Sequence, residues 1–73
     1  MSKQRFQVLG ARIAYYRKLK GMTQLDLALA AEISEDYVSL IENGKAPGLT
    51  IATGIRIADA LGVELGDLVQ EQL

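Results

Sequence analysis

The 73-residue chain contains no cysteine and no histidine. Disulfide bonds and thiolate metal sites are therefore excluded, and the imidazole that zinc sites use most often is missing. Hydrolytic triads that depend on these residues cannot form, and the sequence has no glycine-rich phosphate loop. We therefore expect a protein that is not an enzyme and that holds no metal or other cofactor.

Long apolar runs are missing as well. No segment approaches the roughly 18 apolar residues of a membrane-spanning helix, and residues 1–5 lead into an amphipathic pattern instead of a signal-peptide core. We expect a soluble, cytoplasmic protein without a membrane partner. The length predicts one domain over residues 1–73, and because so small a domain has little room for a pocket, we expect no small-molecule ligand.

Acidic residues are absent from the first part of the chain. Residues 1–20 carry six Lys or Arg side chains, whereas residues 21–73 carry two against nine Asp or Glu side chains, for a net charge of −1. The acidic total argues against a nucleic-acid partner, but a local basic surface attracts phosphate even when the total charge does not. Two interpretations stay open: a phosphate-binding surface, and a solvated basic helix paired with acidic neighbours.

Apolar residues recur at the three- and four-residue spacing of helices, and no strand-like alternation competes with this pattern. Phe6, Leu9, Ile13 and Tyr16 predict a first helix that runs to about Lys20. Four further helices are predicted over residues 24–31, 35–43, 51–61 and 63–69. The predicted fold class is therefore an all-α bundle of five helices.

Capping residues set the predicted boundaries. Thr23, with Asp26 three residues on, matches a capping box, and Ser34 and Thr50 are N-cap candidates. Glycines provide the stop signals, at Gly21, Gly44 and Gly62. Gly54, inside the fourth predicted helix, indicates a close helix contact, because glycine there costs roughly 1 kcal/mol relative to alanine.

Only residues 32–34 separate the short helices predicted over residues 24–31 and 35–43. So short a turn sends the two helices off at a steep angle, which is the arrangement of a helix-turn-helix, here over residues 23–44. This arrangement lets the second helix enter the major groove of DNA. Because many helical bundles contain a short helix pair, a purely structural pair stays open beside DNA binding.

Several short segments keep the order and spacing of a known family. They are LGARI (residues 9–13), RKLKGMTQ (17–24), LA (27–28), IS (33–34), IENGK (41–45) and IADALGV (57–63). Over about residues 8–70 the chain resembles the Cro/C1-type (XRE) helix-turn-helix family, to which phage repressors belong. The resemblance implies a lambda-repressor-like five-helix domain. It also implies a sequence-specific regulator that represses or activates transcription as a homodimer on paired half-sites of double-stranded DNA, and repression is the role we expect.

The family pattern implies roles for residues around the turn. Gln24 contacts a phosphate and braces the recognition helix, and Thr23 offers its hydroxyl and the helix N-terminus to a phosphate. Asn43 and Lys45 contact the DNA backbone beyond the recognition helix, which positions the protein without selecting bases.

Arg17 and Glu42 match positions that form an ion pair in the relatives, so the resemblance implies a link between the first and third helices. Two independently solvated charges are the alternative. The chain departs from its family at Glu32, where relatives commonly have a left-handed glycine and another residue costs roughly 1 kcal/mol. It departs again at Glu64, where relatives often have a Ser or Asp cap for the last helix.

The exposed side of the recognition helix departs most from its family. Relatives usually place Gln, Arg, Ser or Thr there, whereas this chain has two acids, an aromatic ring and a leucine. Carboxylates accept hydrogen bonds from the cytosine amino group, and Leu40 or Tyr37 can contact a thymine methyl. The alternative is that Glu35 or Asp36 serves only the helix N-terminus while Tyr37 and Ser39 face the DNA. The full predicted contact set is Arg17, Thr23, Gln24, Ser34, Glu35, Asp36, Tyr37, Ser39, Leu40, Asn43 and Lys45.

A dimer needs an apolar surface beyond the core. The candidates are Ile51, Ile55, Leu65, Leu68, Val69 and Leu73, whose alternative role is the core itself, favoured for Leu65 and Leu68. The acidic side chains leave a second class of function open. It is a protein-interaction module, or an antitoxin subunit, that keeps the fold with a degenerate recognition helix.

Overall fold

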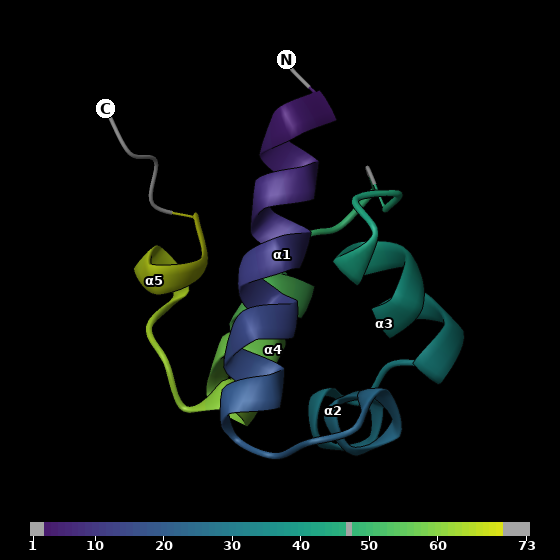
Figure 1. Cartoon of the computed structure of the whole chain (residues 1–73), viewed down its shortest axis with the longest axis vertical. Coiled ribbons are helices and arrows are strands. Elements are labelled where there is room, and N and C mark those ends of the chain that lie inside the picture. Colours follow the sequence, from purple (N-terminus) through teal and green to yellow (C-terminus); the bar gives the residue numbers. More distant parts are fainter. Residues whose placement is uncertain (1–2, 47, 70–73) are drawn as a thin grey trace.

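The structure is a computed structural model that describes residues 3–46 and 48–69, with side chains described from Val8 onward within these ranges. It contains α1 (Lys3–Leu19), α2 (Gln24–Ala31), α3 (Glu35–Glu42), α4 (Ile51–Leu61) and α5 (Leu65–Val69) (Figure 1). All regular secondary structure in the described ranges is helical, which confirms the predicted all-α bundle. None of these helices is long and apolar enough to cross a membrane.

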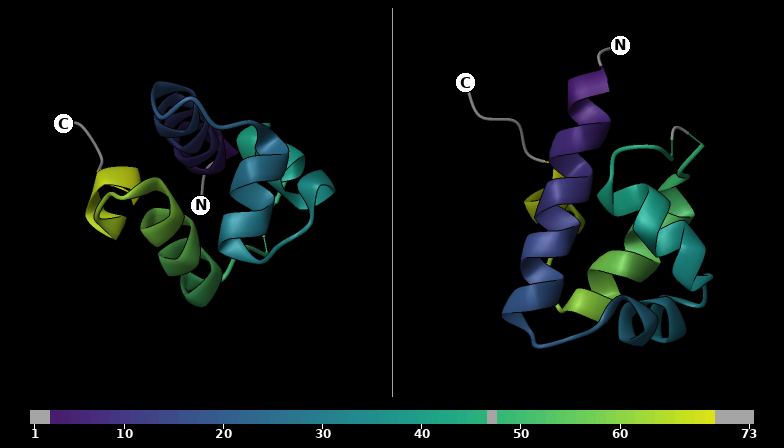
Figure 2. Two further views of the ribbon diagram at one scale, coloured as in Figure 1. Left: turned by 90° about the horizontal axis from the view of Figure 1, so that it is seen from below. Right: turned by 45° about the vertical axis from the view of Figure 1, so that its right-hand side comes forward.

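The longest helix, α1, separates two parts of the bundle. α2 and α3 lie on one side of it and α5 on the other, while α4 packs against both α1 and α2 (Figures 1 and 2). Every helix contributes to the core, whose most deeply buried side chains are Ile13, Leu27, Val38, Ile57, Leu61 and Leu68. The predicted inward residues Ala28 and Ile41 are buried too, and the side chain of Phe6 lies outside the described residues. Apolar packing thus holds α2 and α3 in place.

The helix boundaries follow the predicted caps. The bounds of α2 and α4 are as predicted, α1 and α3 each end one residue early, and α5 begins at Leu65. The hydroxyl oxygen of each predicted N-cap accepts a hydrogen bond from the N–H three residues later in the chain. The distances are 3.0 Å for Thr23, 3.0 Å for Ser34 and 3.2 Å for Thr50. At the position of Glu64, the backbone N–H donates to the carboxylate of Asp67 at 2.9 Å. This bond is the reciprocal half of a capping box, as between Thr23 and Asp26, and it satisfies the N–H of Glu64 itself and not an N–H of the first turn of α5.

Glu32 ends α2 in the left-handed conformation, with φ of 61° and ψ of 44°. Three other helix ends have glycine at the equivalent position, Gly21, Gly44 and Gly62. At all four ends the next residue donates its N–H to the carbonyl five residues earlier, as Ile33 does to Ala28 at 2.9 Å. The four turns are therefore alike, and Glu32 alone carries a Cβ in a conformation that favours glycine.

Replacing Glu32 by glycine is expected to raise the free energy of unfolding by about 1 kcal/mol, because the left-handed strain is removed. Urea denaturation measures the change. Glu32→Ala removes the same charge but keeps the Cβ, so it serves as the matched control and is expected to give no comparable gain. An equal gain in both variants would show that the charge of Glu32, and not its backbone conformation, limits stability.

Two residues of α4 contact neighbouring helices, one in α5 and one in α2. Gly54 is buried, and a Cβ added there would lie 3.4 Å from Cδ1 of Leu65 in α5, which confirms the predicted close contact. Nε of Arg56 donates to the carbonyl of Ala31 at 2.9 Å. This places a cation at the C-terminus of α2, where the helix dipole favours positive charge. Sequence spacing does not predict the second contact, because its partners are 25 residues apart.

Candidate nucleic-acid interface

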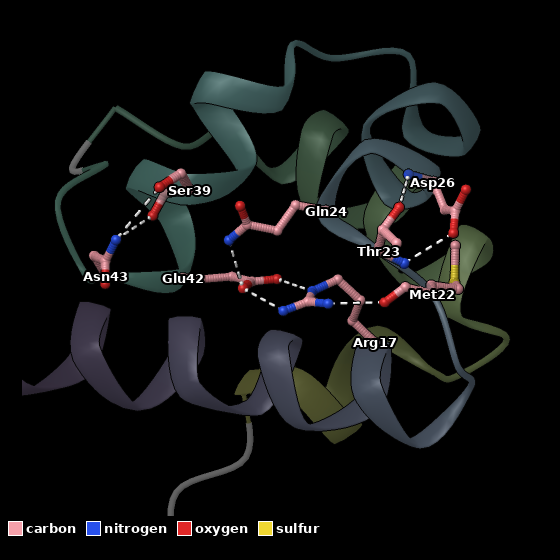
Figure 3. Close-up of polar contacts among 8 residues, drawn as sticks. All are labelled: Arg17, Met22, Thr23, Gln24, Asp26, Ser39, Glu42 and Asn43. Atoms are coloured by element: carbon pink, nitrogen blue, oxygen red, sulfur yellow. Dashed lines mark hydrogen bonds and ion pairs between the residues drawn. The ribbon is translucent and has the colours of Figure 1, made fainter.

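The N-terminus of α2 carries the complete capping box that the sequence predicts (Figure 3). The Thr23 hydroxyl accepts the N–H of Asp26 at 3.0 Å, and the Asp26 carboxylate accepts the N–H of Thr23 at 2.8 Å. The next two N–H groups, those of Gln24 and Leu25, have no acceptor within the helix, as the geometry of a helix start requires. Together with the helix dipole, such groups attract an anion.

Asp26 places a negative charge at this same helix end. The N–H of Thr23 donates to the carboxylate, and this bond lowers the pKa of Asp26, with a smaller contribution from the Thr23 side chain. The carboxyl group therefore stays ionised at neutral pH. Its charge stabilises the N-terminus of α2 but repels any phosphate that approaches it.

The contribution of Asp26 to stability is expected to disappear in acid. Since its folded-state pKa lies below the ordinary value of 3.8, ionisation stabilises the folded state above that value, and this stabilisation is lost as the pH falls through the folded-state pKa. The difference in free energy of unfolding between wild type and Asp26→Asn should therefore shrink between about pH 7 and about pH 2. Denaturation at several pH values measures it. A difference that is the same throughout would show that Asp26 does not act through its charge.

Three helices meet at the carboxylate of Glu42, near the end of α3 (Figure 3). Arg17 from α1 holds it through two bonds, Nε to Oε2 at 2.6 Å and Nη2 to Oε1 at 3.1 Å. Nε2 of Gln24, from the start of α2, donates to the same Oε1 at 3.1 Å. The predicted ion pair is confirmed, and the bond from Gln24 confirms that this residue braces α3, as the resemblance implied.

Arg17 is turned inward. The residue is 9% exposed, and its third nitrogen, Nη1, donates to the carbonyl of Met22 at 2.8 Å. The hydrogen bond to Glu42 raises the pKa of Arg17 above its ordinary value, although burial acts in the opposite direction. With all three nitrogens engaged inside the protein, Arg17 orients α3 against α1.

The side of α3 that the sequence predicts to contact bases, here called the base-contact face, consists of Glu35, Asp36, Tyr37, Ser39 and Leu40. Glu35 and Asp36 are exposed in the first turn, where the helix dipole favours negative charge. Leu40, one turn after Asp36, is 45% exposed. Tyr37 is half-buried and packs against the core, so only part of its ring faces outward.

The remaining predicted contact residues lie at the two ends of α3. The hydroxyl of Ser34 caps its N-terminus by accepting the N–H of Tyr37 at 3.0 Å. At the other end, Nδ2 of Asn43 donates to the carbonyl of Ser39 at 2.8 Å and contacts its hydroxyl at 3.5 Å (Figure 3). Lys45 follows as an exposed cation. In Figure 3, the labelled polar side chains form a row from the end of α3 to the start of α2.

Comparison with known proteins identifies the family that shares this arrangement of helices. A helix-turn-helix family model matches residues 13–68. The chain is also 33% identical over 63 residues, 86% of its own length and 80% of the relative's, to y4dJ of Sinorhizobium fredii, named as an uncharacterized HTH-type transcriptional regulator. The chain belongs to the XRE-type helix-turn-helix family of transcriptional regulators.

Solved helix-turn-helix proteins share the whole bundle. The restriction-modification controller protein C.AhdI from Aeromonas hydrophila superposes with a TM-score of 0.82 at 27% identity, over 86% of this chain and 94% of that one. The clp gene regulator ClgR from Corynebacterium glutamicum has a TM-score of 0.79 at 30% identity, over 86% and 80% of the two chains. These likenesses confirm the predicted five-helix helix-turn-helix fold.

The charged side chains of this helix-turn-helix are mostly acidic. Residues 21–44 contain five Asp or Glu side chains and no Lys or Arg, and Lys45 is the first cation that follows. For any phosphate, this segment offers only backbone N–H groups, hydroxyls and amides, with Lys45 at its end. Such contacts fix the position of a protein on DNA with little help from charge.

Proposed function

We propose that this protein is a sequence-specific transcriptional repressor that inserts α3 into the major groove of duplex DNA and acts as a homodimer on paired half-sites. The observation that supports the proposal is that side chains of two other helices fix the position of α3. The Glu42 carboxylate is held by Arg17 and Gln24, from the two helices that flank α3. A bidentate, charge-assisted pair fixes geometry as well as adding energy, so α3 is presented at a constant angle to the start of α2.

The proposed contacts fall into three groups within one domain, and most of them lie in the helix-turn-helix of residues 23–44. Phosphates meet the Thr23 hydroxyl, the first N–H groups of α2 and the Lys45 ammonium, with Gln24 as both contact and brace. Ser34, Ser39 and Asn43 lie along the edge of the groove. Bases meet Asp36, the outer part of Tyr37, and Leu40, while Glu35 serves the N-terminus of α3, the alternative that the sequence left open for it. Arg17 belongs to the site as a positioning residue, because its nitrogens are engaged within the protein.

The proposed dimer surface lies on α4 and α5. Ile51 is 74% exposed, and Ile55 and Val69 are exposed beside it. Ile51 and Val69 border an open apolar hollow of about 230 Å³, which is also lined by half-buried Leu65. Leu68 belongs to the core, as its alternative role predicted, and Leu73 lies outside the described residues. A second copy that covers this surface would form a dimer with two α3 helices, and half-sites on DNA that match such a dimer lie about 34 Å apart.

Two measurements test the proposal together. A dimer that neutralises two phosphates, one through each Lys45, should bind a selected duplex about tenfold more weakly at 200 mM than at 50 mM salt. Lys45→Gln should weaken binding to all sequences and flatten this salt dependence. Lys20→Gln is the matched control, because the Lys20 ammonium lies beside Gly62 at the end of α4. Sedimentation should give a dimer that Ile51→Asp dissociates.

The acidic helix-turn-helix favours one other function, a protein-interaction module that has lost its affinity for DNA. Besides the five acids, Leu25 and Leu29 on the outer side of α2 are 48% and 70% exposed. This alternative predicts no binding to any duplex, even at 50 mM salt, and no effect of Lys45→Gln.

A further inference from the structure

The base-contact face carries none of the side chains that recognise purines through paired hydrogen bonds. Arginine and lysine recognise guanine in this way, and asparagine and glutamine recognise adenine. The face has Glu35, Asp36, Tyr37, Ser39 and Leu40 instead. Its chemistry is therefore that of two carboxylate acceptors, two hydroxyls and an apolar group, which suits the pyrimidine edges of the major groove.

The packing of α3 determines which of these side chains point away from the protein. Val38 and Ile41 are buried, and on a helix with 3.6 residues per turn Asp36 lies opposite both of them, with Ser39 and Leu40 on either side of it. Tyr37 packs against the core, and the Ser39 hydroxyl lies beside the amide of Asn43. Asp36 and Leu40 thus project furthest from the protein.

The spacing of this pair matches neighbouring bases. Residues four apart share one side of a helix and lie about 6 Å apart along its axis. This distance corresponds to about two base steps of about 3.4 Å each in DNA. A carboxylate and an apolar side chain at this spacing can meet two nearby bases of one strand.

We infer that α3 recognises a cytosine and a thymine within about two base steps of each other. This inference rests on the proposed function. The carboxylate of Asp36 accepts a hydrogen bond from the N4 amino group of cytosine, and Leu40 packs against the C5 methyl of thymine. Adenine also has an amino group in the major groove, but its adjacent N7 acceptor repels a carboxylate. Glu35 serves the N-terminus of α3.

Modified bases in the duplex selected from a random pool test both contacts. Replacing the recognised thymine by deoxyuridine removes only its methyl group and should weaken binding about fourfold, the cost of about one buried methyl-sized group. Leu40→Ala should abolish this difference. Replacing the guanine opposite the recognised cytosine by 7-deazaguanine should leave binding unchanged, because no side chain donates to its N7.

Asp36→Asn provides the second arm of the test. The amide keeps the shape of the side chain but suits adenine, so the preference for cytosine should fall about tenfold and shift toward adenine at that position. Glu35→Gln, with the same change in charge, is the matched control and should alter binding to all sequences equally. Circular dichroism checks that both variants remain helical.

The outcomes separate this inference from the proposed function. No binding to any duplex at 50 mM salt overturns both. Selective binding that is insensitive to deoxyuridine, that is weakened by 7-deazaguanine, or that keeps its cytosine preference in Asp36→Asn overturns the pyrimidine contacts alone.

Discussion

Replacing Gly10 by alanine is expected to lower the melting temperature by more than about 10 °C, equivalent to about 3 kcal/mol. Gly10 lies where α1 crosses the end of α3. A Cβ there would overlap the carbonyl oxygen of Ile41 and lie 3.0 Å from the carbonyl carbon and oxygen of Glu42. These are backbone atoms, so the two helices must move apart to accept it. Thermal denaturation followed by circular dichroism measures the loss.

The matched control for Gly10 is Gly66→Ala in α5. A Cβ at Gly66 has no neighbouring atom within 4 Å, so this variant should keep or slightly raise the melting temperature through helix propensity. Equal effects of the two substitutions would contradict the close approach of α1 to α3. The approach also bears on function, because it places α1 where Arg17 reaches Glu42.

Removing either member of the Arg17–Glu42 pair is expected to lower the free energy of unfolding by about 3 kcal/mol. The two side chains are only 10% and 7% exposed. Glu42→Gln leaves the guanidinium without a counterion, and Arg17→Met leaves the carboxylate with Gln24 alone. An unpaired charge in so buried a place costs more than the pair contributes. Urea denaturation of each variant measures the cost.

The double variant Arg17→Met/Glu42→Gln separates pairing from packing. Because it leaves no buried unpaired charge, it should cost clearly less than the sum of the two single substitutions. Additive costs would mean that the two side chains act independently, as two solvated charges do. High salt should change the result little, because buried pairs are weakly screened.

Features that depend on neighbours in sequence were predictable. Helix boundaries follow from hydroxyl caps and stop signals that act within five residues, and so Thr23, Ser34 and Thr50 marked the helix starts correctly. The left-handed conformation of Glu32 and the Arg17–Glu42 pair were expected from the family resemblance, and the structure confirms both. Within the site, the contacts with DNA stay a prediction.

Features that depend on three-dimensional packing were not predictable from spacing. Arg56 reaches the carbonyl of Ala31 across 25 residues, and nothing near it in sequence indicates this partner. The half-burial of Tyr37 follows from its packing against the core, which the helical pattern of α3 alone does not determine. The crossing of α1 over α3 gives Gly10 its role for the same reason.

The central claim is that the start of α2 and the base-contact face of α3 form the DNA-binding surface. Its most direct test is an NMR titration of the isotope-labelled protein with a selected duplex at low salt. The amide signals of Gln24, Asp36, Leu40 and Lys45 should shift most, while that of Gly66 in α5 stays unchanged. Shifts confined to α4 and α5, or no shifts at all, would contradict the claim.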